Sequence, residues 1–394
     1  MRRKDKSVSN RTFDLIIRIP IFIVSLCGMA AVALAHGSEE ITEKNAWSDW
    51  IFTPDIVIPS ALIAAIYISG MLRRRTAKLI VPWWRHVLFF AGLFSVFAAL
   101  QSPIDPIAEH LFFVHQIQHL MLRMIGPMLL AISWPEGLLN AGLPTIIRKN
   151  VLVPVVTNNV MRAVFGILAH PVIATVLFIG VLYFWEIPKY HDMSLLNENI
   201  HYLMHMTMLL AGLVFFWRIF DRRSPIPAVV HENGRMSTHD SERHARSKGL
   251  RYGVRLMMLW LVILSNILLG SLTTFKSTLL YPAYTKMGRL FGYTAYGDEQ
   301  IGGIIIWIFG TMMCLVAILI VLQLWGRSER YREERRNAQP ILPTTGAAMV
   351  ARTRPQNRAM AIGLSAFVFT VFFAAILVGV LSYFAGSAAF SSVN

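Results

Sequence analysis

The sequence is poor in charge and in cysteine, and each shortage excludes a class of protein. Only 15% of its 394 residues are charged and 55% are hydrophobic. This composition excludes a soluble globular domain and indicates a membrane protein. The two cysteines, Cys27 and Cys314, cannot form a disulfide framework or a C-x-x-C metal site. Any metal site must therefore be built from histidine, methionine and carboxylate side chains.

Long apolar stretches predict an all-α fold, a polytopic membrane helix bundle. A helix needs about 20 residues to cross a bilayer, and a run of that length can span it only as a helix. We expect seven core transmembrane helices and one extra C-terminal helix. Their predicted ranges are 51–72, 84–101, 111–133, 169–188, 199–220, 252–275, 301–325 and 359–386.

Composition also predicts the domain limits. Residues 1–35 have a basic start, an apolar run and a final A-x-A motif, which is the layout of a secretory signal peptide. An uncleaved N-terminal anchor helix is the alternative. We expect the transmembrane domain at 36–326, with a polar cytoplasmic loop at 221–250. A charged cytoplasmic linker at 327–358 then leads to the extra C-terminal transmembrane helix at 359–394.

The excess of basic residues follows membrane topology and does not indicate a nucleic-acid partner. With the mature N-terminus outside, 29 of the 37 lysines and arginines fall in cytoplasmic stretches and five fall outside. This asymmetry is the positive-inside rule, and it predicts the orientation of a multi-pass protein in a bacterial inner membrane. Twelve carboxylates fall on the outer face, which we expect to attract cations.

Two of the predicted helices each carry a pair of histidines. His115 and His119 lie in the third, and His201 and His205 lie in the fifth. Residues at i and i+4 share one face of a helix, and ionisable groups inside a membrane are costly and usually functional. The orientation places both pairs in the outer halves of their helices. We therefore predict a metal site between these two helices, on the condition that they touch.

Two methionines extend the histidine stripe of the fifth helix. Met204 and Met208 stand at i+3 and i+7 from His201. Imidazole and thioether ligands together suit copper, and thioethers favour Cu(I). The alternative is that both methionines are ordinary packing residues. A haem held by one histidine from each pair is the competing cofactor, but four imidazoles at one depth fit metal ions better.

Several other polar residues are candidate partners of the ligands or access groups for the metal. Gln118 lies on the third helix, while His110 and His191 lie just outside the membrane; each can equally be an ordinary structural residue. If the signal peptide is removed directly before His36, the new N-terminal amine and the imidazole of His36 can together chelate Cu(II). Arg123 lies one turn deeper than His119, where a cation disfavours a nearby metal, so we expect it to pair with a carboxylate or with backbone carbonyls.

Four motifs follow one another in order within residues 55–326. They are Phe112-Phe113-Val114-His115-Gln116-Ile117-Gln118-His119-Leu120 with Gly126-Pro127-Met128-Leu129-Leu130 and Trp134-Pro135; His201-Tyr202-Leu203-Met204-His205 with Phe216-Trp217; Tyr281-Pro282-Ala283-Tyr284; and Asp298-Glu299-Gln300-Ile301-Gly302-Gly303 with Trp307. Together they resemble the CtaG family of cytochrome c oxidase assembly factors. The sequence departs from the usual pattern of that family at Glu299, where glutamine is usual.

The resemblance implies a membrane assembly factor, not an enzyme, that helps a haem–copper oxidase acquire copper at its Cu-B centre. Its implied partners are an oxidase subunit or a periplasmic copper chaperone. The positions that carry over are His115, His119, His201, His205 and Asp298. Because Asp298 opens the seventh helix on the outer side, we expect it to accept an N–H from a ligand imidazole or to cap its own helix.

Two other functions stay open on the sequence alone. A b-type haem membrane electron carrier would absorb visible light in the Soret region. A copper permease would need coordinating groups along the whole path through the membrane. The inner halves of the third and fifth helices offer few such groups, which favours a copper-binding assembly factor.

Overall fold

The computed structural model describes residues 42–48, 50, 52–76, 81–221 and 249–337, together with 362, 366, 369 and 373. All regular secondary structure in these residues is helical. Among them, five helices are long and apolar enough to cross a membrane, or seven if each of two bent pairs counts as one span. The predicted membrane helix bundle is thus confirmed. The signal or anchor segment, His36 and most of the polar loop, linker and C-terminal helix lie outside the described residues.

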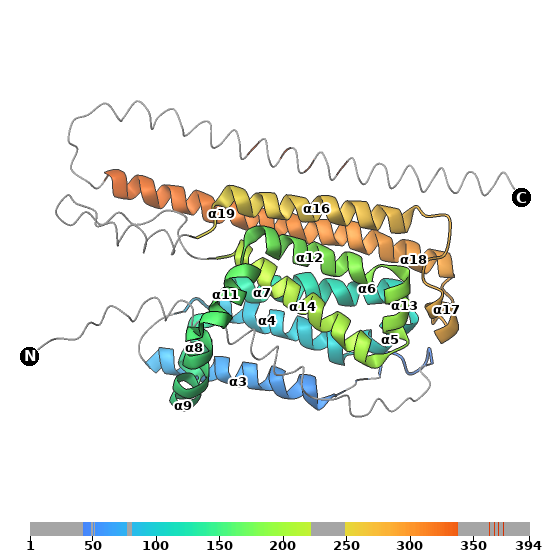
Figure 1. The fold of residues 1–394 in the computed structure, drawn as a ribbon, viewed down its shortest axis with the longest axis horizontal. Coiled ribbons are helices and arrows are strands. Elements are labelled where there is room, and N and C mark those ends of the chain that lie inside the picture. Colours follow the sequence, from blue (N-terminus) through green and yellow to red (C-terminus); the bar gives the residue numbers. More distant parts are fainter. Residues whose placement is uncertain are drawn as a thin grey trace, which may run out of the picture. The chain divides into compact units, whose positions relative to one another are not determined.

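The chain forms two compact units, one of residues 1–222 with 276–305 and the other of residues 223–275 with 306–394. The first unit contains α3 (Pro54–Thr76), α4 (Trp83–Gln101), α5 (Ile104–His110), α6 (Phe112–Leu120), η2 (Met121–Ile125), α7 (Gly126–Ser133), α8 (Glu136–Gly142), α9 (Thr145–Ile147), η3 (Arg148–Leu152), α10 (Val153–Thr157), α11 (Asn159–Leu168), α12 (Pro171–Trp185), α13 (Pro188–Leu195), α14 (Glu198–Ile219), α17 (Ala283–Met287) and α18 (Ala295–Ile304) (Figure 1). The second unit contains α16 (Tyr252–Thr274) and α19 (Gly310–Asn337), and η4 (Ile305–Phe309) joins α18 to α19 along the chain.

In the second unit, α16 and α19 run side by side (Figure 1). Tyr252 of α16 stacks on Trp325 of α19 with ring centroids 6.0 Å apart. The buried Arg255 donates to the carbonyl of Leu250 at 3.0 Å and lies over the Tyr252 ring. This unit carries none of the predicted ligands, so the site depends on the first unit.

The predicted third span is helical throughout, from Phe112 to Ser133, but it contains one π-helical turn. This turn, η2, separates α6 from α7 and holds Arg123. Such turns widen the helix locally and are frequent at functional sites. Here the turn directly follows the helix that carries His115 and His119.

The helix that carries the second histidine pair has a well-defined start. The side chain of Asn197 accepts hydrogen bonds from the backbone N–H groups of Asn199 and Ile200, and so caps α14. The preceding helices α12 and α13 both begin with proline at the first helical position and are bent by 73° to each other. The bend places Glu186 between them, close to α6.

Glycines bring the central helices of the first unit into close contact. A Cβ atom added at Gly212 of α14 would lie 2.3 Å from the backbone oxygen of Arg123, and one at Gly92 of α4 would lie 3.0 Å from the backbone oxygen of Gly126. Membrane helices approach closely where small residues meet. Gly212 therefore holds α14 directly against η2, at the inner end of the two histidine helices.

The predicted spans 111–133 and 169–188 leave residues 134–168 as a connection, and the structure shows helices α8 to α11 there. Prolines at 135, 144 and 154 interrupt this segment, so its apolar residues do not form one continuous run. The segment Thr145–Thr157 and α11 meet at an angle of 67° and together are apolar enough to be a broken span or a re-entrant loop. These helices were not predicted, because only an uninterrupted apolar stretch indicates a span from sequence.

Candidate metal centre

The four histidines of the two pairs meet in the first unit. Within each helix the ring centroids are 4.3 Å apart for His115 and His119, and 4.4 Å apart for His201 and His205. Between the helices, His115 lies 5.2 Å from His201 and 5.8 Å from His205, and His119 lies 5.7 Å from His205. The condition set by the sequence, that the third and fifth predicted helices touch, is met.

The Nε2 atoms of all four imidazoles are buried and have no hydrogen-bond partner within the part of the chain that the structure describes. Buried polar atoms are nearly always paired, so four unpaired nitrogens in one place need an explanation. Ligand nitrogens of His115, His201 and His205 all lie within 4.8 Å of one another. A metal ion with bonds of about 2 Å holds three nitrogens about 3.5 Å apart, so small ring rotations would close the site.

Three of the four rings turn their Nδ1 atom toward a polar group behind them. The Nδ1 atom of His115 lies 2.7 Å from the hydroxyl of Tyr284. The Nδ1 atom of His119 lies 4.0 Å from an oxygen of Glu186 and that of His201 lies 3.7 Å from an oxygen of Glu109, both beyond hydrogen-bond distance; within the described residues the Nδ1 atom of His119 has no hydrogen-bond partner. A hydrogen-bonded partner such as the one that His115 has is characteristic of metal-binding histidines, because it orients the ring and leaves the other nitrogen for the metal.

His191 extends this arrangement by one further residue. Its ring is fully buried 5.1 Å from that of His115, and its Nε2 atom lies 2.9 Å from the hydroxyl of Tyr284. Its Nδ1 atom lies 3.1 Å from the backbone oxygen of Trp185. The sequence predicted His191 to lie near the pairs. The structure places its ring beside that of His115 and also joins it to His115 through the Tyr284 hydroxyl.

Glu186 is a buried residue at the site that the sequence reasoning missed. One of its oxygens accepts a hydrogen bond from the side-chain amide of Gln116 at 2.8 Å. Its other oxygen and its backbone carbonyl both accept from the hydroxyl of Tyr281, at 3.0 and 2.9 Å. Burial raises the pKa of Tyr281 well above its ordinary value, so the phenol keeps its proton and remains a donor. These bonds hold the carboxylate on the Nδ1 side of the His119 ring.

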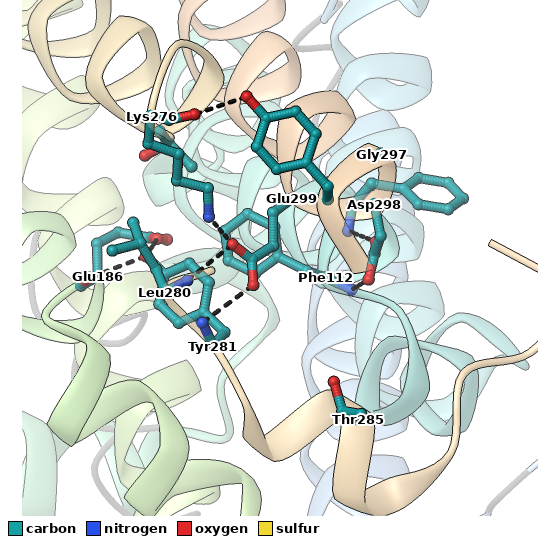
Figure 2. Close-up of polar contacts among 12 residues, drawn as sticks. Phe112, Glu186, Lys276, Leu280, Tyr281, Thr285, Gly297, Asp298 and Glu299 are labelled. Carbon is teal, nitrogen blue, oxygen red and sulfur yellow. Dashed lines mark hydrogen bonds and ion pairs between the residues drawn. The ribbon is translucent and has the colours of Figure 1, made fainter. Parts of the chain in front are cut away.

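Tyr281 and Tyr284 both lie in the segment between α16 and α18. Two carboxylates of α18, those of Asp298 and Glu299, bond to this segment and to the start of α6. Figure 2 shows the side chain of Glu299 between Lys276 and the backbone of Leu280 and Tyr281. The carboxylate accepts both backbone N–H groups at 3.0 Å and forms a buried ion pair with Lys276. The position that departs from the family pattern thus fixes the stretch of chain that carries Tyr281 and Tyr284.

Asp298 has a role that differs from both sequence predictions. Its oxygens accept the backbone N–H groups of Phe112 at 3.1 Å and Phe113 at 3.0 Å, and pair with Arg289 at 3.1 Å. It therefore caps α6, the helix with the first histidine pair, and neither its own helix nor an imidazole (Figure 2). Thr294 caps α18 in its place. The prediction was wrong because this contact joins positions 186 residues apart.

Gln118 and His110 hold the helices around the site. Gln118 donates to the backbone oxygen of Ala99 at 2.8 Å and to Asp105 at 2.5 Å, which ties α6 to α4 and α5. His110 contacts the backbone oxygen of Gly288 at 2.6 Å through Nδ1, which ties α5 to the segment with the tyrosines. Both residues hold helix positions through these bonds, and their roles as partners of the ligands or as access groups stay predictions.

The remaining candidates are the two methionines and Arg123. Met204 and Met208 are fully buried, and the sulfur of Met204 accepts a hydrogen bond from Ser194 at 3.5 Å. Their role as copper ligands stays a prediction. Arg123 donates to the backbone oxygen of Phe178 at 3.2 Å and lies over the Phe178 ring, so its expected pairing with a carbonyl is confirmed.

The fold and the site define a class: an α-helical membrane protein with a buried cluster of imidazoles between two of its helices. A comparison with known protein families matches residues 65–239 and 241–328 to the family described as cytochrome c oxidase caa3 assembly factor, Caa3_CtaG. The protein belongs to this family, as the four motifs predicted.

Similar proteins occur in mycobacteria. An uncharacterized protein of Mycobacterium leprae is 24% identical over 292 residues, which cover 73% of this chain and 41% of that protein. Uncharacterized proteins of Mycobacterium bovis and Mycobacterium tuberculosis are each 23% identical over 288 residues, covering 71% of this chain and 40% of theirs. The chain thus spans about two fifths of the length of these relatives. No solved structure matches it.

Proposed function

We propose that this protein is a non-enzymatic assembly factor that binds copper at His115, His119, His201 and His205 and aids its delivery to a haem–copper cytochrome c oxidase. The observation that carries the proposal is the cluster of four buried imidazoles from two helices, whose Nε2 atoms have no hydrogen-bond partner among the described residues and three of which bring ligand nitrogens within 4.8 Å of one another. Membership of the caa3 assembly factor family supports an oxidase subunit as the recipient.

The charge of the site supports Cu(I) as the bound ion. The four imidazoles are neutral donors when they bind a metal, and the nearest carboxylates, Glu186 and Glu109, face the rings from behind. The cost of burying an ion rises with the square of its charge, so a divalent ion costs roughly four times as much as a monovalent one at equal radius. Neutral nitrogen ligands, with Met204 and Met208 as candidate thioethers, therefore suit Cu(I).

We propose that copper reaches the site from the outer side of the membrane, past Glu109 and His201. His201 is the most exposed of the four rings at 8%, and the Glu109 side chain beside it is 33% exposed. The positive-inside distribution of lysine and arginine supports an outward orientation of this end. A periplasmic copper chaperone would donate the ion there.

The geometry is less favourable to the two other functions. Two rings can bind a haem from opposite sides, but here two more imidazoles lie within 5.8 Å of the pair, in the space that a porphyrin would need. For a permease, the ion would have to continue inward past Arg123, which is buried and positively charged one turn below His119. A copper site open to one side fits these observations better.

The test is a Cu(I) titration of the purified full chain against a chromophoric chelator, with an optical spectrum of the same sample. The wild type should bind copper and show no Soret absorption. The double variant His119→Ala, His205→Ala should lose binding, and cells that carry it should make oxidase deficient in copper. His170→Ala, an exposed histidine at the start of α12, serves as the control. Unchanged copper binding in the double variant would contradict the proposal.

A further inference from the structure

Taking the proposed copper site as given, we propose that Tyr284 and His191 are positioning residues for His115. Together they hold His115 as the tautomer that carries its proton on Nδ1. This tautomer leaves the Nε2 lone pair of His115 free for the metal. The proposal follows from the directions in which three consecutive hydrogen bonds can run.

Three hydrogen bonds join the backbone of Trp185 to His191, His191 to Tyr284, and Tyr284 to His115. Their directions are determined by the first, in which His191 contacts a backbone carbonyl. The carbonyl oxygen of Trp185 can only accept, so the Nδ1 atom of His191 must donate to it across 3.1 Å. A neutral imidazole has one N–H group, and the Nε2 atom of His191 is therefore an acceptor. The hydroxyl of Tyr284, 2.9 Å away, must then donate its hydrogen to that atom.

The same reasoning continues to the metal site. Tyr284 has one hydroxyl hydrogen, and it is used on His191. The contact of 2.7 Å with His115 must therefore run the other way, from the Nδ1–H group of His115 to the tyrosine oxygen. The Nε2 atom of His115 carries the lone pair, and this is the atom that has no partner in the described structure.

The neutral state of His191 is essential to this direction. The ring is fully buried, and its two hydrogen-bond partners are a carbonyl and a phenol, neither of which would compensate a positive charge. An imidazolium without a charged partner is costly in such a place.

The opposite direction of the Tyr284–His115 hydrogen bond would prevent His115 from binding a metal through Nε2. If Tyr284 donated to His115, the proton of that ring would have to be on Nε2, and this nitrogen could not bind a metal without losing it. The series from Trp185 to His115 thus decides which nitrogen is available. Phe112, which stacks on Tyr281 with centroids 4.4 Å apart and meets the edge of His191 at 5.5 Å, holds the ring of His191 in place.

The first test reads the tautomer directly in metal-free, full-length protein in lipid. Solid-state NMR of ¹⁵N-histidine-labelled protein distinguishes protonated from unprotonated Nδ1, and the His115 signal is identified by its loss in His115→Asn. The wild type should show a protonated Nδ1 and an unprotonated Nε2. Tyr284→Phe should convert His115 partly or wholly to the Nε2–H form. An Nε2–H form in the wild type would overturn the proposal.

The second test measures copper. Loss of an outer hydrogen-bond partner typically lowers metal affinity 10–100-fold, and we expect a fall of about this size for Cu(I) in Tyr284→Phe. The matched control is Tyr67→Phe, because Tyr67 is a buried tyrosine whose hydroxyl contacts the Nδ1 atom of His86 at 3.0 Å in α3 and α4, away from the site. Equal copper affinity in Tyr284→Phe and the wild type would overturn the proposal.

The two tests separate this proposal from the copper assignment. If the wild type shows the Nδ1–H form of His115 but binds no copper, the copper function fails and the assigned tautomer stands. If Tyr284→Phe does not accumulate in the membrane, the NMR spectrum of the wild type still decides the tautomer, because it requires no variant of Tyr284.

Discussion

The substitution Gly212→Ala should separate the two histidine helices. A Cβ atom at position 212 would lie 2.3 Å from the backbone oxygen of Arg123, whereas ordinary contacts of a Cβ atom begin at 3.4 Å. The backbones must therefore move apart by about 1 Å, the difference of these two distances. The obstacle is backbone, so no side-chain rotation can relieve it.

This displacement is large for a metal site. His205 lies seven residues before Gly212 on the same helix, which is about 10 Å along the axis. Metal–ligand distances are held to within about 0.2 Å, so a shift of α14 that carries even half of the 1 Å to His205 would weaken binding. We expect a fall in Cu(I) affinity of at least about tenfold. Overpacking of this kind costs about 1–3 kcal/mol of stability.

The control is Gly180→Ala in α12, where an added Cβ atom has nothing within 4 Å. Both variants replace glycine by alanine in an apolar helix, so the change in helix propensity is the same. They differ in the steric overlap with the Arg123 backbone, which only Gly212→Ala introduces. The assays are Cu(I) competition with a chelator and thermal unfolding in the same detergent. If Gly212→Ala retains the affinity and the unfolding temperature of Gly180→Ala, the inferred close contact between α14 and η2 is wrong.

Three further predictions test the surroundings of the site. Asp298→Asn should lower the free energy of unfolding by about 2–4 kcal/mol in denaturant titrations, because it removes the charge that caps α6; an unchanged midpoint would contradict this. Glu109→Gln should slow Cu(I) uptake in stopped-flow measurements and leave the final affinity nearly unchanged, because its carboxylate lies beside His201 at the exposed edge; an unchanged rate would refute the proposed access route. Burial raises the pKa of Tyr281 and Tyr284 above 10.0, so at higher pH the unfolded chain loses phenolic protons that the folded protein keeps. The unfolding temperature should therefore fall as pH rises past about 10, and less steeply in Tyr281→Phe; equal slopes would contradict the shift.

The histidine pairs were predictable because their spacing is local. Whether His115 and His119 share a face depends only on helix geometry, and their depth depends only on charge counted along the chain. The same rules placed His201 and His205. The contact between the two helices was not predictable in this way, because it depends on where a residue such as Gly212 meets the backbone of a distant segment.

The groups behind the imidazoles could not be found from local spacing. Tyr284 lies 169 residues from His115 along the chain, and Glu186 lies 70 residues from Gln116. The motif Tyr281-Pro282-Ala283-Tyr284 marked this region as part of the family pattern. Its hydrogen bond to His115 could not be predicted, because it depends on the folded chain placing this segment against α6. Asp298 shows the same limit, since its position at the start of α18 suggested a local cap while its actual hydrogen bonds go to another helix.

The arrangement of these outer groups bears on how copper would leave. Behind His115, the series through Tyr284 and His191 ends at a backbone carbonyl, which ties that ring to fixed parts of the fold. His201 has the longer contact of 3.7 Å with Glu109, a side chain that is itself partly exposed. Of these two rings, His201 has the longer contact and is also the nearer to solvent. We therefore expect transfer to begin with release from His201, while His115 keeps its position until the recipient has bound the ion.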